Sequence, residues 1–334
     1  VHSQLSRQLN WNTLTPPNFP IGASTRELGM NTNRAEYLPH EGVMTEEISS
    51  IFKNVPSGIF IDATYGYGSH FNLSNNFSHL KFIGFDRDIE SVNNSKNEHN
   101  VFHLNFSEIY KFLSENSSLP LSGILYDFGL SSHQIDSEYR GFSYQANTLL
   151  DMRMNTKQNL TAENIVNNYT ENDLTKVLRT YSEDKYSKKI SKKIIESRPI
   201  LTTNELVNVI KDAVPKQNPI YIEKTIRRIF QALRIEVNNE LDEIKNSLSS
   251  IKNSIKEKGV IVCISYHSLE DKIVKNFFND ITTDCICEPS IPICRCDIIQ
   301  EFKYPKKKKF TPSSNEKETN PRSKSAIMRY VVKL

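Results

Sequence analysis

The sequence lacks any uninterrupted apolar run long enough to cross a membrane. A transmembrane helix needs about 20 such residues, whereas runs such as VIVCIS have only the length of a β-strand. The net charge of +3 over 334 residues is too small to indicate nucleic-acid binding by itself. We therefore expect no membrane partner, and the partners that the protein does have must be inferred from its motifs.

Cysteine is also scarce, and most of it lies in one short segment, CICEPSIPICRC. This distribution excludes a disulfide framework spread over a secreted fold. Thiolates can form a closed tetrahedral zinc site, and the candidate ligands are Cys285, Cys287, Cys294 and Cys296. The Cys-x-Cys pairs are tighter than the usual Cys-x2-Cys spacing, so reduced thiols without a metal remain the alternative.

The first 36 residues show no hydrophobic periodicity and are poor in acidic side chains. Residues 1–36 are therefore predicted to form a flexible extension. The arginines in this segment make it weakly similar to an organellar transit peptide. We expect a location in the mitochondrial matrix, with the bacterial cytoplasm as the alternative.

Between residues 59 and 129, short apolar runs alternate with polar stretches of helical length. This alternation predicts an α/β fold with a doubly wound parallel sheet. After residue 140 the strands give way to helical periodicity, which predicts an inserted all-helical domain at residues 140–225. The sheet domain is then discontinuous and comprises residues 37–139 and 226–334. An apolar stripe from Leu233 to Ile255 predicts one long helix, which Gly259 would end.

A glycine loop follows the first predicted strand in the segment IDATYGYGSH. Gly66 and Gly68 would let the backbone approach a ligand where a Cβ atom would clash. Asp86 follows at the distance at which nucleotide-binding folds place an acid on the ribose hydroxyls. The alternatives are an ordinary tight turn and an acid that caps the next helix. The loop is not GxGxxG, which favours S-adenosylmethionine over a dinucleotide.

Polar residues also follow the fourth predicted strand in the segment DFGLSSHQ. Open sheets bind ligands at the carboxyl ends of their strands, so these side chains could face the same ligand as the glycine loop. The alternative is a loop packed by its own hydrogen bonds. The candidates are Asp127, Ser131, Ser132, His133 and Gln134. A further polar group, in SYHSLEDK, follows the strand VIVCIS and could reach the same place.

Several segments together resemble the small-subunit ribosomal RNA cytosine-N4-methyltransferases, the bacterial 16S enzymes and their mitochondrial relatives. They occur in order from Tyr37 to Leu334 and include YLPHEGVMTEEI, DATYGYGSH, FDRD, DFGLSSHQID, RGFSYQ, LDMRM, FQALRIEVNNEL, SYHSLEDKIVK and NPRSKSAIMR. The resemblance implies a class I S-adenosylmethionine methyltransferase with a Rossmann-like sheet and a helical insertion. It also implies N4-methylation of a cytidine, with small-subunit ribosomal RNA or the assembling subunit as partner, and leaves a homodimer open.

The resemblance also assigns residues to the methyl donor and to catalysis. Matched to the family's motifs, the donor contacts are Gly68, Ser69, His70, Asp86, Phe106, Asp127 and Gln134. Phe106 would lie against adenine, and Asp127 with Ser131 or Ser132 would act on the cytosine amine. The chain departs from the pattern at Ser69, where relatives usually have glycine, at Gly42, and at Thr148-Leu149.

Other functions stay open on the sequence alone. A methyltransferase fold could bind ribosomal RNA during subunit assembly without catalysing transfer, although the donor-site acids argue against this. A nicotinamide oxidoreductase is disfavoured by the missing third glycine. The residues themselves do not exclude a DNA cytosine or a protein substrate. The lysine block 306–309 and the segment KKISKK are candidates for phosphate contacts, with solvated surface as the alternative.

Overall fold

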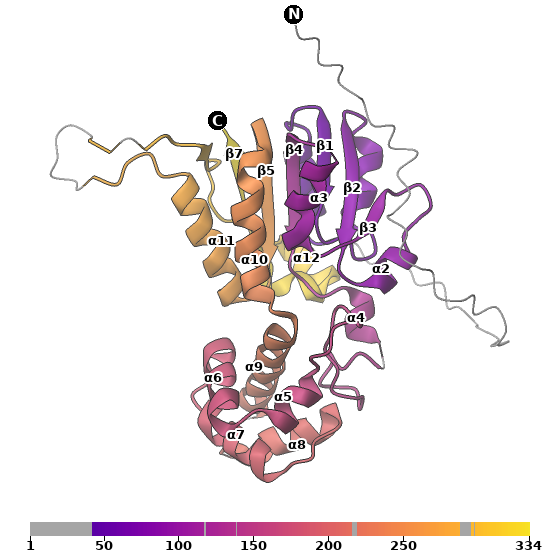
Figure 1. Ribbon diagram of the computed structural model, residues 1–334, viewed down its shortest axis with the longest axis vertical. Coiled ribbons are helices and arrows are strands. Elements are labelled where there is room, and N and C mark those ends of the chain that lie inside the picture. Colours follow the sequence, from indigo (N-terminus) through magenta and orange to yellow (C-terminus); the bar gives the residue numbers. More distant parts are fainter. Residues whose placement is uncertain (1–41, 117, 138, 216–218, 288–294, 297) are drawn as a thin grey trace, which may run out of the picture.

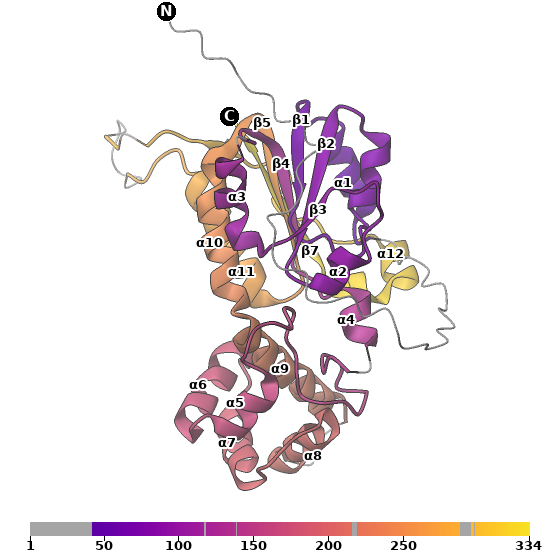
Figure 2. The same cartoon turned by 45° about the vertical axis from the view of Figure 1, so that its right-hand side comes forward.

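The computed structural model describes residues 42–334, except 117, 138, 216–218, 288–294 and 297. The predicted extension at residues 1–36 lies outside the described residues, so its similarity to a transit peptide stays a prediction. None of the described helices has both the length and the apolar character needed to cross a membrane. Figures 1 and 2 show an α/β sheet domain with a helical domain beyond one end of the sheet.

The sheet contains seven strands in the order β3-β2-β1-β4-β5-β7-β6. The first five strands in sequence run parallel, and β7 pairs antiparallel with both β5 and β6. Their bounds are β1 Gly58–Asp62, β2 Leu80–Asp86, β3 Val101–His103, β4 Leu121–Asp127, β5 Ile255–Ser265, β6 Phe302–Lys303 and β7 Ile327–Lys333. The predicted doubly wound α/β sheet is confirmed, and the antiparallel edge was not foreseen.

Helices cover both faces of this sheet, as buried strands require. Helix α1 (Thr45–Phe52) packs with the 3-10 helix η2 (Phe71–Asn76) against one face. On the other face lie α3 (Ile109–Glu115), α10 (Glu240–Ile251) and α11 (Ser268–Ile281). The central strand β4 is buried at every position except its last, Asp127, so its carboxyl end reaches open space.

The helical domain is built around its own apolar core, which runs from Phe142 to Val237. Three of its helices begin with a threonine cap, which satisfies free N–H groups at the first turn. The helices are α5 Ala162–Asn168, α6 Glu171–Ser182, α7 Ser187–Glu196, α8 Thr203–Ala213 and α9 Pro219–Asn238. The predicted domain boundary at residue 225 falls inside α9, whose later residues pack in this same core.

The predicted long helix from Leu233 to Ile255 is wrong. It is broken at Asn239, which has φ 50° and separates α9 from α10. Asparagine tolerates this left-handed conformation better than most residues. Leu233 packs in the helical domain and Leu248 in the sheet domain, so one apolar stripe serves two cores. Strand β5 already begins at Ile255, and Gly259 therefore lies within a strand and does not cap a helix.

Short helices follow the strands at the end of the sheet that faces the helical domain. Helix α2 (Ile89–Asn93) follows β2, and α4 (Ser132–Asp136) follows β4. Near the C-terminus, α12 (Ser314–Thr319) and the 3-10 helix η5 (Pro321–Ser325) precede β7. The carboxyl ends of the parallel strands, where such folds bind ligands, therefore face the helical domain.

Candidate functional site

The loop after β1 is held against the end of β2. Gly66 has φ +55° and Gly68 has φ +74°, a conformation that favours glycine. A Cβ atom on Gly68 would also lie only 2.8 Å from the hydroxyl of Tyr65. The backbone N–H of Gly66 donates to Asp86 Oδ2 at 2.7 Å, across 20 residues of sequence. Burial raises the pKa of Asp86 to about 7, although N–H bonds from Asp88 and Gly66 lower it.

A cavity at the strand ends, here called the strand-end cavity, brings together residues that the sequence predicted separately. Asp86, Phe106, Asp127, Ser131 and Gln134 all line it. The rest of its lining is Ala63, Thr64, Arg87, Phe128, Gly129, Met154, Glu240, Ile244 and Glu270. Acids at two strand ends and an aromatic ring beyond a third therefore share one site.

Asp127 is fixed by contacts from several elements. Its backbone N–H donates to Thr64 Oγ1 at 2.7 Å, and its Oδ1 accepts from the N–H of Gly129 at 3.1 Å. The hydroxyl of Tyr266 also donates to this carboxylate. Its Oδ2 lies 3.7 Å from His70 Nδ1. Burial raises the pKa of Asp127, and the charge of His70 and the Gly129 N–H only partly oppose this.

A second, larger cavity lies between the sheet domain and the helical domain. This interdomain cleft has a volume of about 730 Å³. Aromatic and cationic side chains from both domains line it, namely Tyr67, Phe142, Tyr144, Phe230, Tyr266, Arg227, Arg234 and Arg322. The cleft and the strand-end cavity share four wall residues, Thr64, Asp127, Gly129 and Ser131. Asp127 therefore lies in a wall that the small strand-end cavity shares with the large cleft.

Some predicted ligand residues already have partners within the protein. Ser131 and Gln134 form a capping box at the start of α4. The Gln134 amide nitrogen donates to Asp88 Oδ2 at 2.9 Å. His70 is 5% exposed, and its Nε2 donates to the carbonyl of Val43 at 2.8 Å. These bonds position the loops around the site. They do not test whether the same residues contact the donor, so those contacts stay predictions.

Three further predicted residues remain, of which Ser69 and His133 are not among the described residues that line the strand-end cavity. Ser69 lines the interdomain cleft. His133 Nε2 lies 3.0 Å from Glu90 Oε2, so this ring is held by a hydrogen bond beside α2. The Ser132 backbone begins α4, but its side chain lies outside the described part of the chain. Among the predicted catalytic residues, Asp127 and Ser131 are thus the two that the structure places in the cavity walls.

The segment SYHSLEDK contributes a largely buried ionic cluster to the wall of the cleft, which His267 and Arg234 line. Glu270 Oε2 accepts from the N–H of Tyr266 at 2.8 Å, and Glu270 Oε1 lies 3.0 Å from His267 Nε2. Arg234 makes two bonds to Glu240, at 2.8 and 2.9 Å, and lies 3.8 Å from Glu270. Burial alone would raise the pKa of Glu270, but His267 and Arg234 hold it below its usual value. These contacts favour a structural histidine over a catalytic one.

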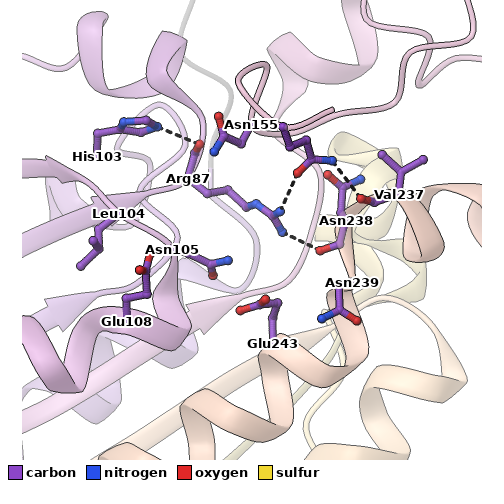
Figure 3. A pocket seen from close by; sticks show the side chains of 11 residues that line it. Arg87, His103, Leu104, Asn105, Glu108, Asn155, Val237, Asn238, Asn239 and Glu243 are labelled. Atoms are coloured by element: carbon purple, nitrogen blue, oxygen red, sulfur yellow. Dashed lines mark hydrogen bonds between the residues drawn. The ribbon is translucent and has the colours of Figure 1, made fainter. Parts of the chain in front are cut away.

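A third cavity, of about 320 Å³, adjoins the strand-end cavity at Arg87, which lines both (Figure 3). Arg87 directly follows Asp86, and its Nη1 donates to the Asn238 carbonyl at 3.1 Å. Its Nη2 lies 3.5 Å from Gln158 Oε1, and its own carbonyl accepts from His103 Nε2 at 3.1 Å. The end of β2 is thereby tied to the junction of α9 and α10.

Sequence reasoning missed Arg140, although the motif RGFSYQ contains it. Arg140 is 2% exposed and donates to Asp88 Oδ2 and Glu90 Oε2, both at 2.9 Å. It also donates to the carbonyls of Arg153 and Met154, at 2.9 and 3.0 Å. It therefore holds the end of β2 and the LDMRM segment together. Thr64 and Tyr266 were missed too, because their roles depend on Asp127 being beside them.

Three of the four cysteines predicted as zinc ligands lie close together in the structure. The sulfurs of Cys285, Cys287 and Cys296 all lie within 4.8 Å of one another. Cys294, the fourth predicted ligand, lies outside the described residues. No residue of this group lines any of the three cavities described above.

Asp62, at the end of β1, gives a pH-dependent prediction. It is 1% exposed, and its Oδ2 has no hydrogen-bond partner among the described residues. Burial raises the pKa of Asp62 from 3.8 to about 6. Because the folded state holds this proton to higher pH than the unfolded state, Asp62 costs no stability below about pH 4. Its cost then grows as the pH rises toward 6 and is constant above that.

We expect Asp62→Asn to remove this cost. Relative to the wild type, its free energy of unfolding should rise by on the order of 2–3 kcal/mol between pH 4 and pH 7. Urea unfolding across this range measures the difference, and Asp280→Ala, at an exposed site on α11, is the control. Asp86 also has a raised pKa, to which the charge of Asp62 contributes, so the loss of that charge in Asp62→Asn adds to the same rise. The prediction would be contradicted if the difference in free energy of unfolding between Asp62→Asn and the wild type stayed constant between pH 4 and pH 7.

The strand-end cavity has a volume of about 70 Å³, and it is the chemistry of its lining residues that fits S-adenosylmethionine. Gly66 and Gly68 line neither this cavity nor the cleft, but the Gly66 N–H holds Asp86, whose carboxylate lies in the cavity wall at the strand end where such folds bind a ribose. Phe106 offers an aromatic surface in the same cavity, beyond the end of β3. These residues would hold the donor, and the open end at Asp127 would face its acceptor.

Comparisons with known proteins show the family of the chain. A family model described as the MraW methylase family matches residues 37–334. Ribosomal RNA small subunit methyltransferase H of Clostridioides difficile is 40% identical, covering 88% of this chain and 99% of that protein. The protein of the same name from Caldicellulosiruptor bescii is 41% identical, covering 90% and 99%. A solved rRNA methylase from Streptococcus thermophilus is 7% identical, with a TM-score of 0.36 and coverage of 86% and 95%.

The strand order, the shared wall at Asp127 and a family match that covers all the described residues lead to one assignment. The chain has the class I methyltransferase fold with a helical insertion, and its methyl donor is S-adenosylmethionine. The chain belongs to the MraW methylase family.

Proposed function

We propose that the protein transfers a methyl group from S-adenosylmethionine to the N4 amine of a cytidine in small-subunit ribosomal RNA. The observation that carries the proposal is the position of Asp127 in the wall shared by the strand-end cavity and the interdomain cleft. A group that touches both cavities can act at the point where donor and acceptor meet. The name shared by the relatives supports ribosomal RNA as the acceptor.

The interdomain cleft suits a single nucleotide turned out of its stack. Enzymes that modify a base bring it into a pocket where it stacks on aromatic side chains. Tyr67 and Tyr266 enter the cleft from the sheet domain, and Phe142 and Tyr144 from the connection to the helical domain. Arg227 lies beside Tyr144, with 3.4 Å between its Nη2 and the tyrosine hydroxyl. The cleft thus combines stacking surfaces with a cation that could meet a phosphate.

S-adenosylmethionine, when bound, supplies a methyl group already activated by a positively charged sulfur. The protein's contribution is therefore mainly to position the acceptor. A cytosine amine is a weak nucleophile because its lone pair is delocalised into the ring. A carboxylate that accepts a hydrogen bond from the amine favours the localised lone pair, and we assign this role to Asp127. Tyr266 and Gly129 hold the orientation of that carboxylate.

Basic side chains on each domain could hold the surrounding RNA. Helix α7 exposes Lys188, Lys189 and Lys192 on the helical domain. On the sheet domain, Arg322 lies in the 3-10 helix before β7 and lines the cleft. It pairs with Asp136 at 2.8 Å. Phosphate contacts of this kind would give affinity that falls as salt rises.

The rival function is an RNA-binding assembly factor that carries the fold without catalysis. Three kinds of cell distinguish the two functions: cells with the wild-type gene, cells without the gene, and cells with the Asp127→Ala form. Their small-subunit RNA is compared. Under our proposal, nucleoside mass spectrometry finds N4-methylcytidine only with the wild-type gene. If the protein acts only in assembly, the modification is unchanged by Asp127→Ala, and subunit assembly fails only when the gene is absent.

A further inference from the structure

The connection between α11 and β6 contains the cysteine group and lies far from the cavities. It leaves the sheet domain at the β6–β7 edge and projects away from the helical domain (Figure 1). Little of it is buried: Ile286 is 71% exposed and Ile299 is 84% exposed. The described part of this connection contains no helix or strand between Ile281 and Phe302. Apolar burial therefore contributes little to holding its shape.

The sulfur positions match a metal centre better than a disulfide. The sulfurs of Cys285 and Cys296 are 3.7 Å apart, and Cys287 completes a group within 4.8 Å. A tetrahedral zinc ion with bonds of about 2.3 Å would separate its sulfur ligands by about 3.8 Å. A disulfide would need a sulfur separation of about 2.05 Å. These thiols thus already lie near the spacing that one zinc ion requires.

The backbone around these sulfurs also favours negative charge on them. The N–H of Cys287 donates to Cys285 Sγ at 3.3 Å, and the N–H of Ile286 donates to Cys296 Sγ at 3.4 Å. The N–H of Arg295 donates to Cys287 Sγ at 3.4 Å. Each sulfur therefore accepts at least one backbone hydrogen bond from the described residues, and such bonds stabilise a thiolate over a thiol. Zinc binds the thiolate form.

We propose that Cys285, Cys287 and Cys296 bind one structural Zn²⁺ ion, together with a fourth donor that completes the tetrahedron. Each cysteine gives up its thiol proton to solvent as its Zn–S bond forms, so binding weakens at low pH. No electron transfer is involved. The ion fixes the connection between α11 and β6, which the apolar core does not reach. This site is independent of methyl transfer.

The test is the metal content of the full-length protein after expression with added zinc and purification without chelator. We expect roughly one zinc per chain, and less than about a tenth of that in Cys296→Ala and in Cys287→Ser. The matched control is Cys263→Ala, which removes a cysteine fully buried in β5 and should keep the metal. Donor binding should be unchanged in the Cys296 and Cys287 variants, which shows that they fold.

Cobalt substitution gives a second measurement. A tetrahedral thiolate site gives intense sulfur-to-cobalt absorption in the near ultraviolet, and this band should be lost in Cys296→Ala and kept in Cys263→Ala. Wild-type protein without zinc, equal metal loss in Cys263→Ala, or a Cys285–Cys296 disulfide in non-reduced peptide mass spectra would each overturn the proposal. None of these outcomes bears on the proposed methyl transfer, which is measured on RNA.

Discussion

Replacing Asp127 with alanine is expected to lower the rate of methyl transfer by about 10²–10⁴-fold. The carboxylate lies in the wall between the two cavities and is the only acidic group among the four residues that line both. Donor affinity should fall far less, since Asp86 and the glycine loop remain in place. Single-turnover transfer to small-subunit RNA measures the first effect, and equilibrium binding of S-adenosylmethionine measures the second.

Two variants sharpen this experiment. Asp127→Asn keeps an oxygen that can accept from the Gly129 N–H but removes the charge, and we expect an intermediate loss of rate. Asp280→Ala removes an exposed acid on α11 and should transfer at the wild-type rate. An Asp127→Ala protein that binds donor normally and still methylates at the wild-type rate would remove Asp127 from the chemistry.

Replacing Arg140 with methionine is expected to lower the free energy of unfolding by about 3–5 kcal/mol, the cost of leaving a buried charge without its partner. Asp88 is 1% exposed, and Arg140 is its cationic partner at 2.9 Å. Methionine keeps much of the apolar stem, so the loss reflects the guanidinium contacts and not a large cavity. Chemical denaturation followed by circular dichroism measures the change.

The matched control is Arg322→Met, at an ion pair with Asp136 that is much more exposed. Exposed pairs contribute up to about 1 kcal/mol. Equal losses in the two variants would contradict the role assigned to Arg140. A large loss in Arg140→Met alone would show that the end of β2 depends on the segment leading into the helical domain.

The sequence predicted features that depend on local pattern and on motif. The strands from Ile59 to Asp127 have continuous apolar runs because both faces of the sheet are covered. Asp86 and Gly66 were paired by their spacing, and a hydrogen bond of 2.7 Å joins them. The spacing succeeds here because adjacent parallel strands place their carboxyl ends side by side.

Features that depend on tertiary contacts could not be predicted in this way. The break at Asn239 interrupts an apolar stripe that stays periodic across it, because α9 and α10 face different cores. Arg140 appears in the sequence as one more charged residue, and its burial depends on carbonyls of Arg153 and Met154. The interdomain cleft likewise needs two domains in place before its aromatic residues face one another.

The most direct test of methyl transfer to cytidine uses purified protein, unmethylated small ribosomal subunits or their RNA, and S-adenosylmethionine with a deuterated methyl group. Nucleosides from the reaction are then separated and identified by mass spectrometry. Our account predicts deuterated N4-methylcytidine with the wild-type protein and none with Asp127→Ala. Label on a different nucleoside, on another atom of cytidine, or on no nucleoside at all would contradict it.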